Sequence, residues 1–143
     1  MKLLDKELKI PRLVVAGATS GVGKTSITSA IIYGIKKRGY SVQAFKVGPD
    51  YIDPSYLSAI SGNNTRNLDV WLMGENELVQ SFVKNSASDI SIIEGVMGYY
   101  DGFGGKTNYA STHHVASLVK SPTVLILDAS RTCLLYTSDA ADE

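Results

Sequence analysis

The sequence holds a single cysteine, no surplus of either charge and no long apolar run. One cysteine cannot form an internal disulfide, and no group of Cys and His residues has the spacing of a zinc site. The 14 basic residues balance 14 acidic ones, so we expect no basic face for nucleic acid or anionic lipid. The longest apolar stretches fall far short of the roughly 20 residues that span a bilayer. These absences exclude a membrane span and favour small molecules or other proteins as partners.

The N-terminus also lacks the apolar core of a signal peptide, because Asp5, Lys6, Glu7 and Lys9 lie among its leucines. We therefore expect a cytoplasmic protein. What the chain does have is 143 residues with 44% hydrophobic content and 13 glycines, which fits one ordinary globular domain.

Short apolar runs alternate with helix-compatible segments, and this alternation predicts an α/β fold with a mostly parallel sheet flanked by helices. Each run is almost continuously apolar, as a strand covered on both faces should be. The predicted strands are residues 13–16, 42–47, 90–94 and 124–128. The predicted helices are residues 25–38, 57–61, 75–85 and 112–120, and glycines end the first two.

Residues 17–25, GATSGVGKT, lie between the first predicted strand and the first predicted helix. They depart from the G-x-x-x-x-G-K-[ST] pattern, because Ala18 stands at the first glycine position and Gly17 one residue earlier. The later glycines still allow backbone N–H groups to turn toward an anion at the helix start. We predict a phosphate loop in which Lys24 contacts the phosphates of ATP and Thr25 holds Mg²⁺. The residues predicted to contact the nucleotide are Thr19, Ser20, Gly21, Val22, Gly23, Lys24, Thr25 and Ser26.

The segment KVGPDYIDP, residues 46–54, follows the second predicted strand. If that strand runs parallel to the first, its carboxyl end meets the phosphate loop at one edge of the sheet. Asp50 and Asp53 then border the nucleotide, where a carboxylate can hold Mg²⁺ and Lys46 can offset charge on a phosphoryl group in transfer. The alternative is a simple turn with solvated carboxylates.

Glu94 ends the third predicted strand, where an acidic residue can reach the metal of a phosphate-loop protein. Residues 95–105 follow with five glycines, and such loops at the carboxyl ends of strands often bind ligands. Asp101 is a candidate there for substrate contact or for organising the metal. Asp69 is a weaker candidate, because a lone aspartate in a polar segment commonly caps a helix.

Several aromatic residues lie near these motifs. Tyr51, Tyr99 and Tyr100 are most simply packing residues, although each can border a planar substrate. His113 and His114 are adjacent, so on a helix they point about 100° apart and cannot both bind one metal. We interpret the two histidines as ordinary helix residues.

Residues 133–143, CLLYTSDAADE, do not continue the pattern, because they supply no glycine turn, helical stripe or strand. They resemble the in-frame translation of a sequencing-library adapter. We therefore expect residues 131–143 to be read-through, and residues 1–130 to be an incomplete synthetase domain of a longer protein. The alternative is a genuine C-terminal extension.

In order and spacing, GATSGVGKTS, KVGPDYIDP, NLD, EGVMGYYDG and STHHVASLVKSPTVLILDAS resemble the N-terminal ATP-binding domain of the cobyrinic acid a,c-diamide synthase family. The resemblance covers residues 12–130, and the pairing of KVGPDYIDP with EGVMGYYDG is much more specific than the phosphate loop. It implies a parallel α/β sheet similar to that of dethiobiotin synthetase and the partitioning ATPases. It also implies a following glutamine amidotransferase domain, which this sequence lacks.

The resemblance implies an enzyme of cobalamin synthesis that uses ATP and Mg²⁺ to phosphorylate the a and c carboxylates of cobyrinic acid. Ammonia from glutamine then converts each acyl phosphate into an amide. The residues expected to act in catalysis are Lys46, Asp50, Asp53 and Glu94, and those expected at the metal are Thr25, Asp50 and Glu94. The residues expected to contact the substrate are Tyr51, Ile52, Asp69, Tyr99 and Asp101.

Two other functions stay open. A nickel-sirohydrochlorin a,c-diamide synthase shares these motifs and differs in its tetrapyrrole. A partitioning-type ATPase is instead a nucleotide switch that dimerises, but its K-G-G-x-G-K-T loop begins with lysine, where this chain has Thr19 and Ser20. Without the glutaminase domain, we expect this chain at most to bind nucleotide, with weak ammonia-dependent activity, and to hydrolyse no glutamine. A homodimer is a candidate assembly.

Overall fold

The computed structural model describes residues 9–130, so the expected read-through at residues 131–143 lies outside the described residues. The five strands are β1 (Arg12–Gly17), β2 (Val42–Val47), β3 (Arg66–Leu68), β4 (Ile90–Glu94) and β5 (Thr123–Ile126). The helices are α1 (Lys24–Lys37), α2 (Asp53–Ser61), α3 (Val70–Asn85) and α4 (Thr112–Leu118), with a short 3₁₀ turn η1 (Phe103–Gly105).

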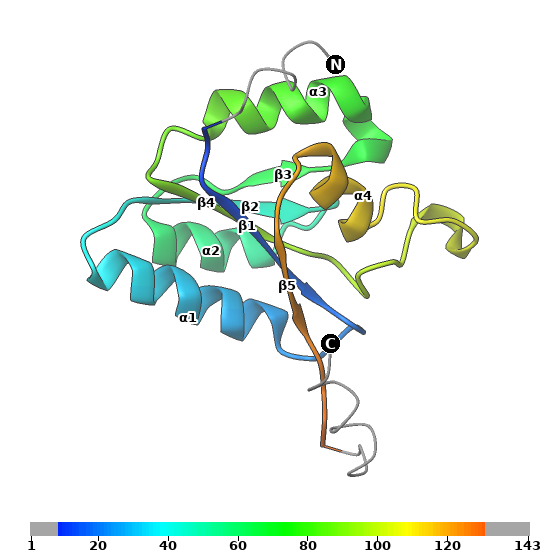
Figure 1. Cartoon of the computed structure of the whole chain (residues 1–143), viewed down its shortest axis with the longest axis horizontal. Helices are drawn as coiled ribbons and strands as arrows, with labels where there is room; N and C mark the ends of the chain where they lie inside the picture. Colours follow the sequence, from blue (N-terminus) through cyan, green and yellow to red (C-terminus); the bar gives the residue numbers. More distant parts are fainter. Residues whose placement is uncertain (1–8, 131–143) are drawn as a thin grey trace.

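The strands form one parallel sheet in the order β3-β2-β4-β1-β5, which confirms the predicted fold class. In Figure 1, α1 and α2 cover one face of this sheet, and α3 and α4 cover the other. Glu94 at the end of β4 pairs with Val15 of β1 on one side and with Lys46 of β2 on the other. Because parallel strands end at the same edge, the loops after β1, β2 and β4 meet there.

Each face of the sheet has its own apolar core, because successive side chains of a strand point to opposite faces. Val15, Ala44 and Ile92 pack with the α1 and α2 residues Ile32 and Leu57. Their neighbours in sequence point the other way: Val14, Phe45 and Ile93 pack with the α3 residues Leu78 and Phe82. The two cores make the sheet a rigid middle layer that positions the loops at its edge.

Three elements differ most from the sequence prediction; in addition, η1 was not expected, and α4 and β5 each end two residues earlier than predicted. β3 was not expected, because it has three residues and Arg66 and Asn67 are polar, so no apolar run marks it. α2 begins at Asp53 rather than at residue 57, because Pro54 is well tolerated in a first helical turn, where the missing N–H has no partner to lose. α3 begins at Val70 rather than at residue 75, and the non-helical backbone of Gly74 separates its first turn from the apolar stripe.

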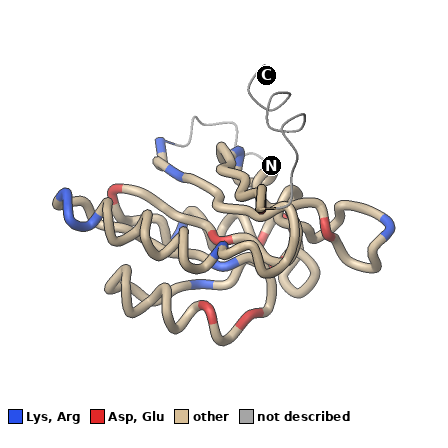
Figure 2. Tube along the Cα trace, turned by 90° about the horizontal axis from the view of Figure 1, so that it is seen from below, with Lys and Arg blue, Asp and Glu red and all other residues tan. Residues whose placement is uncertain are grey.

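No helix among residues 9–130 is long and apolar enough to cross a membrane. In the view of Figure 2, basic and acidic positions are scattered along the trace rather than gathered on one side. The formal net charge of the full sequence is zero.

Candidate nucleotide-binding site

The loop between β1 and α1 borders a hollow of about 400 Å³, which we call the phosphate hollow. Two glycines shape the loop. A Cβ on Gly17 would lie 2.5 Å from Val22 Cγ2, so only glycine fits there. Gly23 has φ of 90° and precedes α1, and no side chain of the described residues caps that helix. The first N–H groups of α1 are therefore left to an anion. The hollow is lined by Ser20, Gly21, Gly23, Lys24, Thr25, Ser26, Lys46, Asp50, Asp53, Glu94, Val96 and Met97.

Most of the residues predicted to contact the nucleotide line this hollow, but Thr19 and Val22 do not. Val22 instead faces Gly17, and the Thr19 carbonyl accepts a hydrogen bond of 3.1 Å from Lys24 Nζ. The same ammonium donates a shorter bond of 2.7 Å to the carbonyl of Met97. Burial lowers the pKa of Lys24 below its ordinary value, and the positive charge of Lys46 acts in the same direction.

Lys46 is the more enclosed of the two lysines that line the hollow, with only 2% of its surface exposed. Its ammonium donates to Asp53 Oδ2 at 2.7 Å, to Glu94 Oε1 at 2.8 Å and to the Gly95 carbonyl at 3.1 Å. Asp50 Oδ2 lies 3.8 Å from the same nitrogen. Burial lowers the pKa of Lys46, but the hydrogen bonds to Asp53 and Glu94 outweigh burial and hold it above the ordinary value. Lys46 therefore stays charged.

Glu94 has no exposed surface, and its two carboxylate oxygens differ. Oε1 accepts from Lys46 and from the Thr25 hydroxyl, the latter at 2.7 Å. Oε2 has no hydrogen-bond partner in the part of the chain that the structure describes. Burial raises the pKa of Glu94 and outweighs the opposing effect of Lys46. A buried oxygen without a partner is costly, so this atom is a candidate ligand for a cation.

Oxygen ligands at this position fit Mg²⁺, which prefers hydroxyl and carboxylate oxygens and completes its shell with water and phosphate. Thr25 and Glu94 are already hydrogen-bonded to one another beside the phosphate loop. Among residues 9–130, no group of three or more His, Cys, Asp or Glu side chains forms a metal site by itself. The donors present therefore suit a metal that arrives with phosphate better than a metal held by protein alone.

Asp50 supports its own turn as well as facing the hollow. Its Oδ1 accepts from the backbone N–H groups of Ile52 at 2.8 Å and Asp53 at 3.1 Å. Burial raises the pKa of Asp53, but the hydrogen bond and charge of Lys46 outweigh it, so that pKa lies below the ordinary value. The turn considered as an alternative and the predicted site thus occupy the same residues.

Asn67 was missed in the sequence, although it lies in the NLD motif. Its side-chain N–H groups donate to the carbonyls of Gly48 and Asp50 at 2.8 and 2.7 Å, which fastens the end of β3 to the loop after β2. Met97 was missed as well, because its contribution is a backbone carbonyl that no residue pattern reveals. Both residues position parts of the phosphate hollow.

The residues expected to contact the substrate do not line the phosphate hollow. Tyr51 and Ile52 are 87% and 69% exposed on the loop after β2. Asp69 caps α3, where it accepts from the N–H groups of Trp71 and Leu72. The Tyr99 hydroxyl lies 3.3 Å from His113 Nδ1. Asp101 accepts from the Gly98 N–H at 2.8 Å and shapes the glycine-rich loop. Their predicted contacts with substrate stay predictions.

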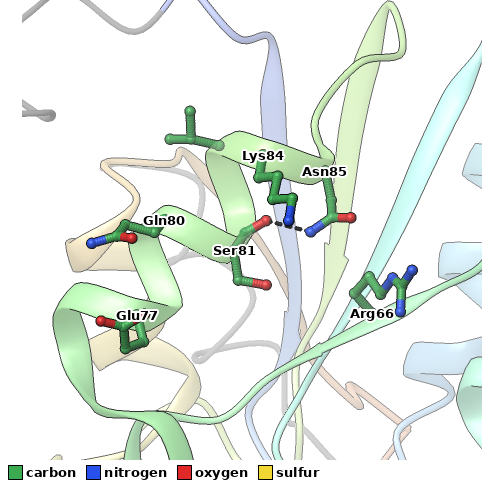
Figure 3. Close-up of a pocket in the computed structure, with 7 residues that line it drawn as sticks. Arg66, Glu77, Gln80, Ser81, Lys84 and Asn85 are labelled. Atoms are coloured by element: carbon green, nitrogen blue, oxygen red, sulfur yellow. Dashed lines mark hydrogen bonds between the residues drawn. The ribbon is translucent and has the colours of Figure 1, made fainter.

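A larger hollow than the phosphate hollow, of about 650 Å³, lies elsewhere, between the start of β3 and the second half of α3. Figure 3 shows Arg66 of β3 lying apart from the side chains that α3 contributes. Within that group, the Asn85 amide donates to the Ser81 carbonyl at 2.7 Å. Neither the phosphate loop nor the buried ion pairs reach this hollow, so volume alone does not locate the chemistry.

A parallel sheet, a phosphate loop before α1 and a buried acid at the end of the neighbouring strand define a P-loop nucleotide-binding domain. Residues 13–133 match the family described as "CbiA: CobQ/CobB/MinD/ParA nucleotide binding domain". The chain belongs to this family, and the match confirms the resemblance that its motifs predicted.

Three relatives are similar to the chain along most of its length. The chain is 48% identical over 119 residues to a cobyrinate a,c-diamide synthase of Listeria innocua, covering 82% of this chain and 26% of the relative. It is 45% identical over 125 residues to a hydrogenobyrinate a,c-diamide synthase of Thermobifida fusca, covering 85% and 26%. A cobyrinate a,c-diamide synthase of Thermoplasma volcanium is 44% identical over 122 residues, covering 85% and 27%. The chain thus spans about a quarter of the length of these relatives.

Proposed function

We propose that this chain is the ATP-binding part of a cobyrinate or hydrogenobyrinate a,c-diamide synthase, which makes amides from two carboxylates of a tetrapyrrole by way of acyl phosphates. The observation that carries the proposal is the hydrogen-bonded chain from Thr25 through Glu94 and Lys46 to Asp53. It joins the loops after β1, β2 and β4 around one phosphate hollow. Relatives named for this reaction match the chain across these loops.

The proposed reaction has two steps. An oxygen of the substrate carboxylate attacks the γ-phosphorus of ATP, the bond from that phosphorus to the bridging oxygen breaks, and ADP leaves. Ammonia then attacks the acyl carbon, the carbon–oxygen bond to phosphate breaks, and a proton passes from nitrogen to the departing phosphate. Phosphorylation is needed because a carboxylate has no useful leaving group.

The residues of the hollow divide this work by charge and position. Lys24 and the free N–H groups at the start of α1 bind the phosphates. Lys46 stays positive and offsets charge on the phosphoryl group as it transfers. Asp53 holds the Lys46 ammonium in place through their bond of 2.7 Å. Thr25 and Glu94, with Asp50, would hold Mg²⁺, which supplies charge neutralisation on the phosphates when it is bound.

Thermal unfolding of the 143-residue chain with ATP and MgCl₂ tests the nucleotide site. A ligand at 100 times its Kd adds about 2.7 kcal/mol, which should raise the Tm by several degrees. EDTA should remove most of that shift if Thr25 and Glu94 hold the metal. The matched variants are Glu94→Gln in the hollow and Glu77→Gln on α3. The proposal would be overturned if ATP did not change the Tm, or if Glu94→Gln and Glu77→Gln lost the ATP-induced shift equally.

The substrate is tested separately, in ammonia buffer and with no glutamine. The proposal expects ADP release that depends on cobyrinic acid, with hydrogenobyrinic acid and nickel-sirohydrochlorin as the competing tetrapyrroles. Preference for nickel-sirohydrochlorin would move the chain to that related synthase. ATP hydrolysis that a protein partner stimulates and no tetrapyrrole affects would favour the partitioning-type switch.

We also propose that the natural protein continues into a glutamine amidotransferase domain. The outer strand β5 supports this, because Val124 and Leu125 are 42% and 45% exposed within the described residues, and exposed apolar strand edges are usually covered. The short share of the relatives that the chain covers agrees with it. Long-read sequencing of the source DNA across the codon for Ser130 decides the matter. A frame that runs on into a domain with Cys and His catalytic residues supports the proposal, and a genomic stop after Glu143 refutes it.

A further inference from the structure

A second hollow of about 490 Å³ adjoins the phosphate hollow, and we call it the loop hollow. The glycine-rich loop after β4 forms it alone. Met97 lines both hollows, so a molecule in the loop hollow lies next to the site of the phosphates. The loop hollow is lined by Met97, Tyr100, Asp101, Gly102, Gly105, Lys106, Thr107 and Asn108.

Phe103 of the same loop and Trp71 of α3 form an exposed aromatic pair. Phe103, in η1, stacks on Trp71 of α3, with ring centroids 5.4 Å apart and planes only 15° from parallel. The two side chains are 59% and 56% exposed, and Tyr100 on the same loop is 65% exposed. Neither ring lines the loop hollow, but Phe103 lies along the chain between Gly102 and Gly105, which do. Aromatic rings gain much by burial, so a stacked pair left in solvent beside the hollow offers a flat apolar surface to a ligand.

The charges of the loop hollow are unequal in their readiness to bind. Asp101 already accepts from the Gly98 N–H at 2.8 Å. Lys106, by contrast, makes no hydrogen bond or ion pair with any of residues 9–130. The loop hollow therefore offers the exposed ring of Tyr100 and a free ammonium, and the stacked pair follows next along the same loop through Phe103. Together these groups suit a broad, near-planar molecule with an acidic group at its rim.

We propose that Trp71, Phe103 and Lys106 form the substrate site, in which the stacked rings hold the face of a macrocyclic polycarboxylate and Lys106 pairs with a carboxylate other than the reacting one. This inference rests on the proposed function and names residues that the sequence motifs did not indicate. The position of Met97 between the hollows then directs the reacting carboxylate toward the phosphates.

Binding measurements on the 143-residue chain test the proposal, with cobyrinic acid as the probe and ATP with MgCl₂ as a separate titration. Trp71 is the only tryptophan, so quenching of its fluorescence reports a macrocycle that binds beside it. By calorimetry, Phe103→Ala should weaken cobyrinic acid binding by roughly threefold to tenfold. Lys106→Ala should weaken it by about threefold, more at low salt, and Lys106→Arg should restore it.

The control is Tyr40→Ala, an aromatic residue of similar exposure at the other edge of the sheet, which should change neither titration. ATP affinity should be unchanged in every variant. If the parent binds ATP and cobyrinic acid, and Phe103→Ala and Lys106→Ala bind cobyrinic acid as the parent does, the inference is wrong and the proposed function stands. If ATP binds but cobyrinic acid does not, the inference is wrong and cobyrinic acid is removed from the proposed function as well. If ATP itself fails to bind, the proposed function falls, and the inference falls with it.

Discussion

The two edges of the sheet treat their charged residues in opposite ways. At the amino edge, Asp89 Oδ2 accepts from the backbone N–H and hydroxyl of Ser41, both at 2.7 Å, and the Asp89 N–H donates back to that hydroxyl. This pair ties the starts of β2 and β4 together. At the carboxyl edge, Glu94 is fully buried and one of its oxygens has no partner among the described residues. The acidic side chain at the amino edge is therefore hydrogen-bonded to its neighbour, while the carboxyl edge keeps one carboxylate oxygen available for a ligand.

Replacing Lys46 should break the carboxyl edge most severely. Lys46→Met leaves Glu94 and Asp53 without their cation, and losing one partner of a buried pair costs about 3 to 5 kcal/mol. Lys36→Met is the matched control, because Lys36 is exposed and donates one bond of 2.8 Å to the Ile60 carbonyl. It should cost less than about 1 kcal/mol. Urea unfolding measures both, and equal losses would mean that the buried network contributes nothing special.

Replacing Lys24, at the same edge, should weaken ATP binding much more than it lowers the free energy of unfolding. Lys24→Ala removes an ammonium that is expected to meet the phosphates, so ATP affinity should fall by about 10- to 100-fold. Its present partners are two backbone carbonyls, so the free energy of unfolding should change by no more than about 1.5 kcal/mol. Titration calorimetry and urea unfolding test these effects, with Lys37→Ala in the last turn of α1 as the unaffected control. Unchanged ATP affinity would remove Lys24 from the site.

Asp69 refines the comparison between the two edges. It follows β3 at the carboxyl edge, yet its carboxylate accepts hydrogen bonds from neighbouring protein groups, as that of Asp89 does. Its Oδ1 accepts from Trp71 and Leu72 at 2.9 and 3.1 Å. Asp69→Ala should lower stability by about 0.5 to 2 kcal/mol, and Asp69→Asn should recover most of the loss because asparagine also caps helices. Thermal unfolding of both variants, beside their tetrapyrrole affinity, separates a cap from a substrate contact. Weak substrate binding by a stable Asp69→Asn variant would restore the substrate role.

The smallest effect belongs to pH at the amino edge. Two hydrogen bonds from Ser41 hold the pKa of Asp89 below its ordinary value. The bond from the hydroxyl has the larger effect, and the bond from the backbone N–H has the smaller one. A depressed carboxyl pKa adds stability above the unfolded-state value, near 3.9, and that stability disappears as pH falls through the lower folded-state value. The free energy of unfolding, measured from pH 6 down to pH 2, should therefore fall less steeply with decreasing pH for Ser41→Ala than for the parent chain. Identical slopes would show that the pair does not titrate with folding.

The sequence allowed the fold class to be predicted but not the arrangement of the network. Four apolar runs identified four strands, and the phosphate loop and the acid at the end of β4 were predicted from their context. The contact of Lys46 with Glu94 could not be predicted, because it depends on β4 lying between β1 and β2, and strand order is set by crossovers rather than by local residues. β3 was not predicted because Asn67 is held by two hydrogen bonds to the backbone rather than by apolar burial, which a residue pattern would reveal.

The bond from Lys24 to Met97 joins the start of α1 to the glycine-rich loop after β4. Met97 has φ of 47°, an unusual backbone for a residue other than glycine, and its carbonyl relies on the Lys24 ammonium as a donor. A phosphate that draws this ammonium away leaves the carbonyl to find another partner. We therefore expect nucleotide binding to alter the backbone of the glycine-rich loop at Met97, because the hydrogen bond from Lys24 is broken.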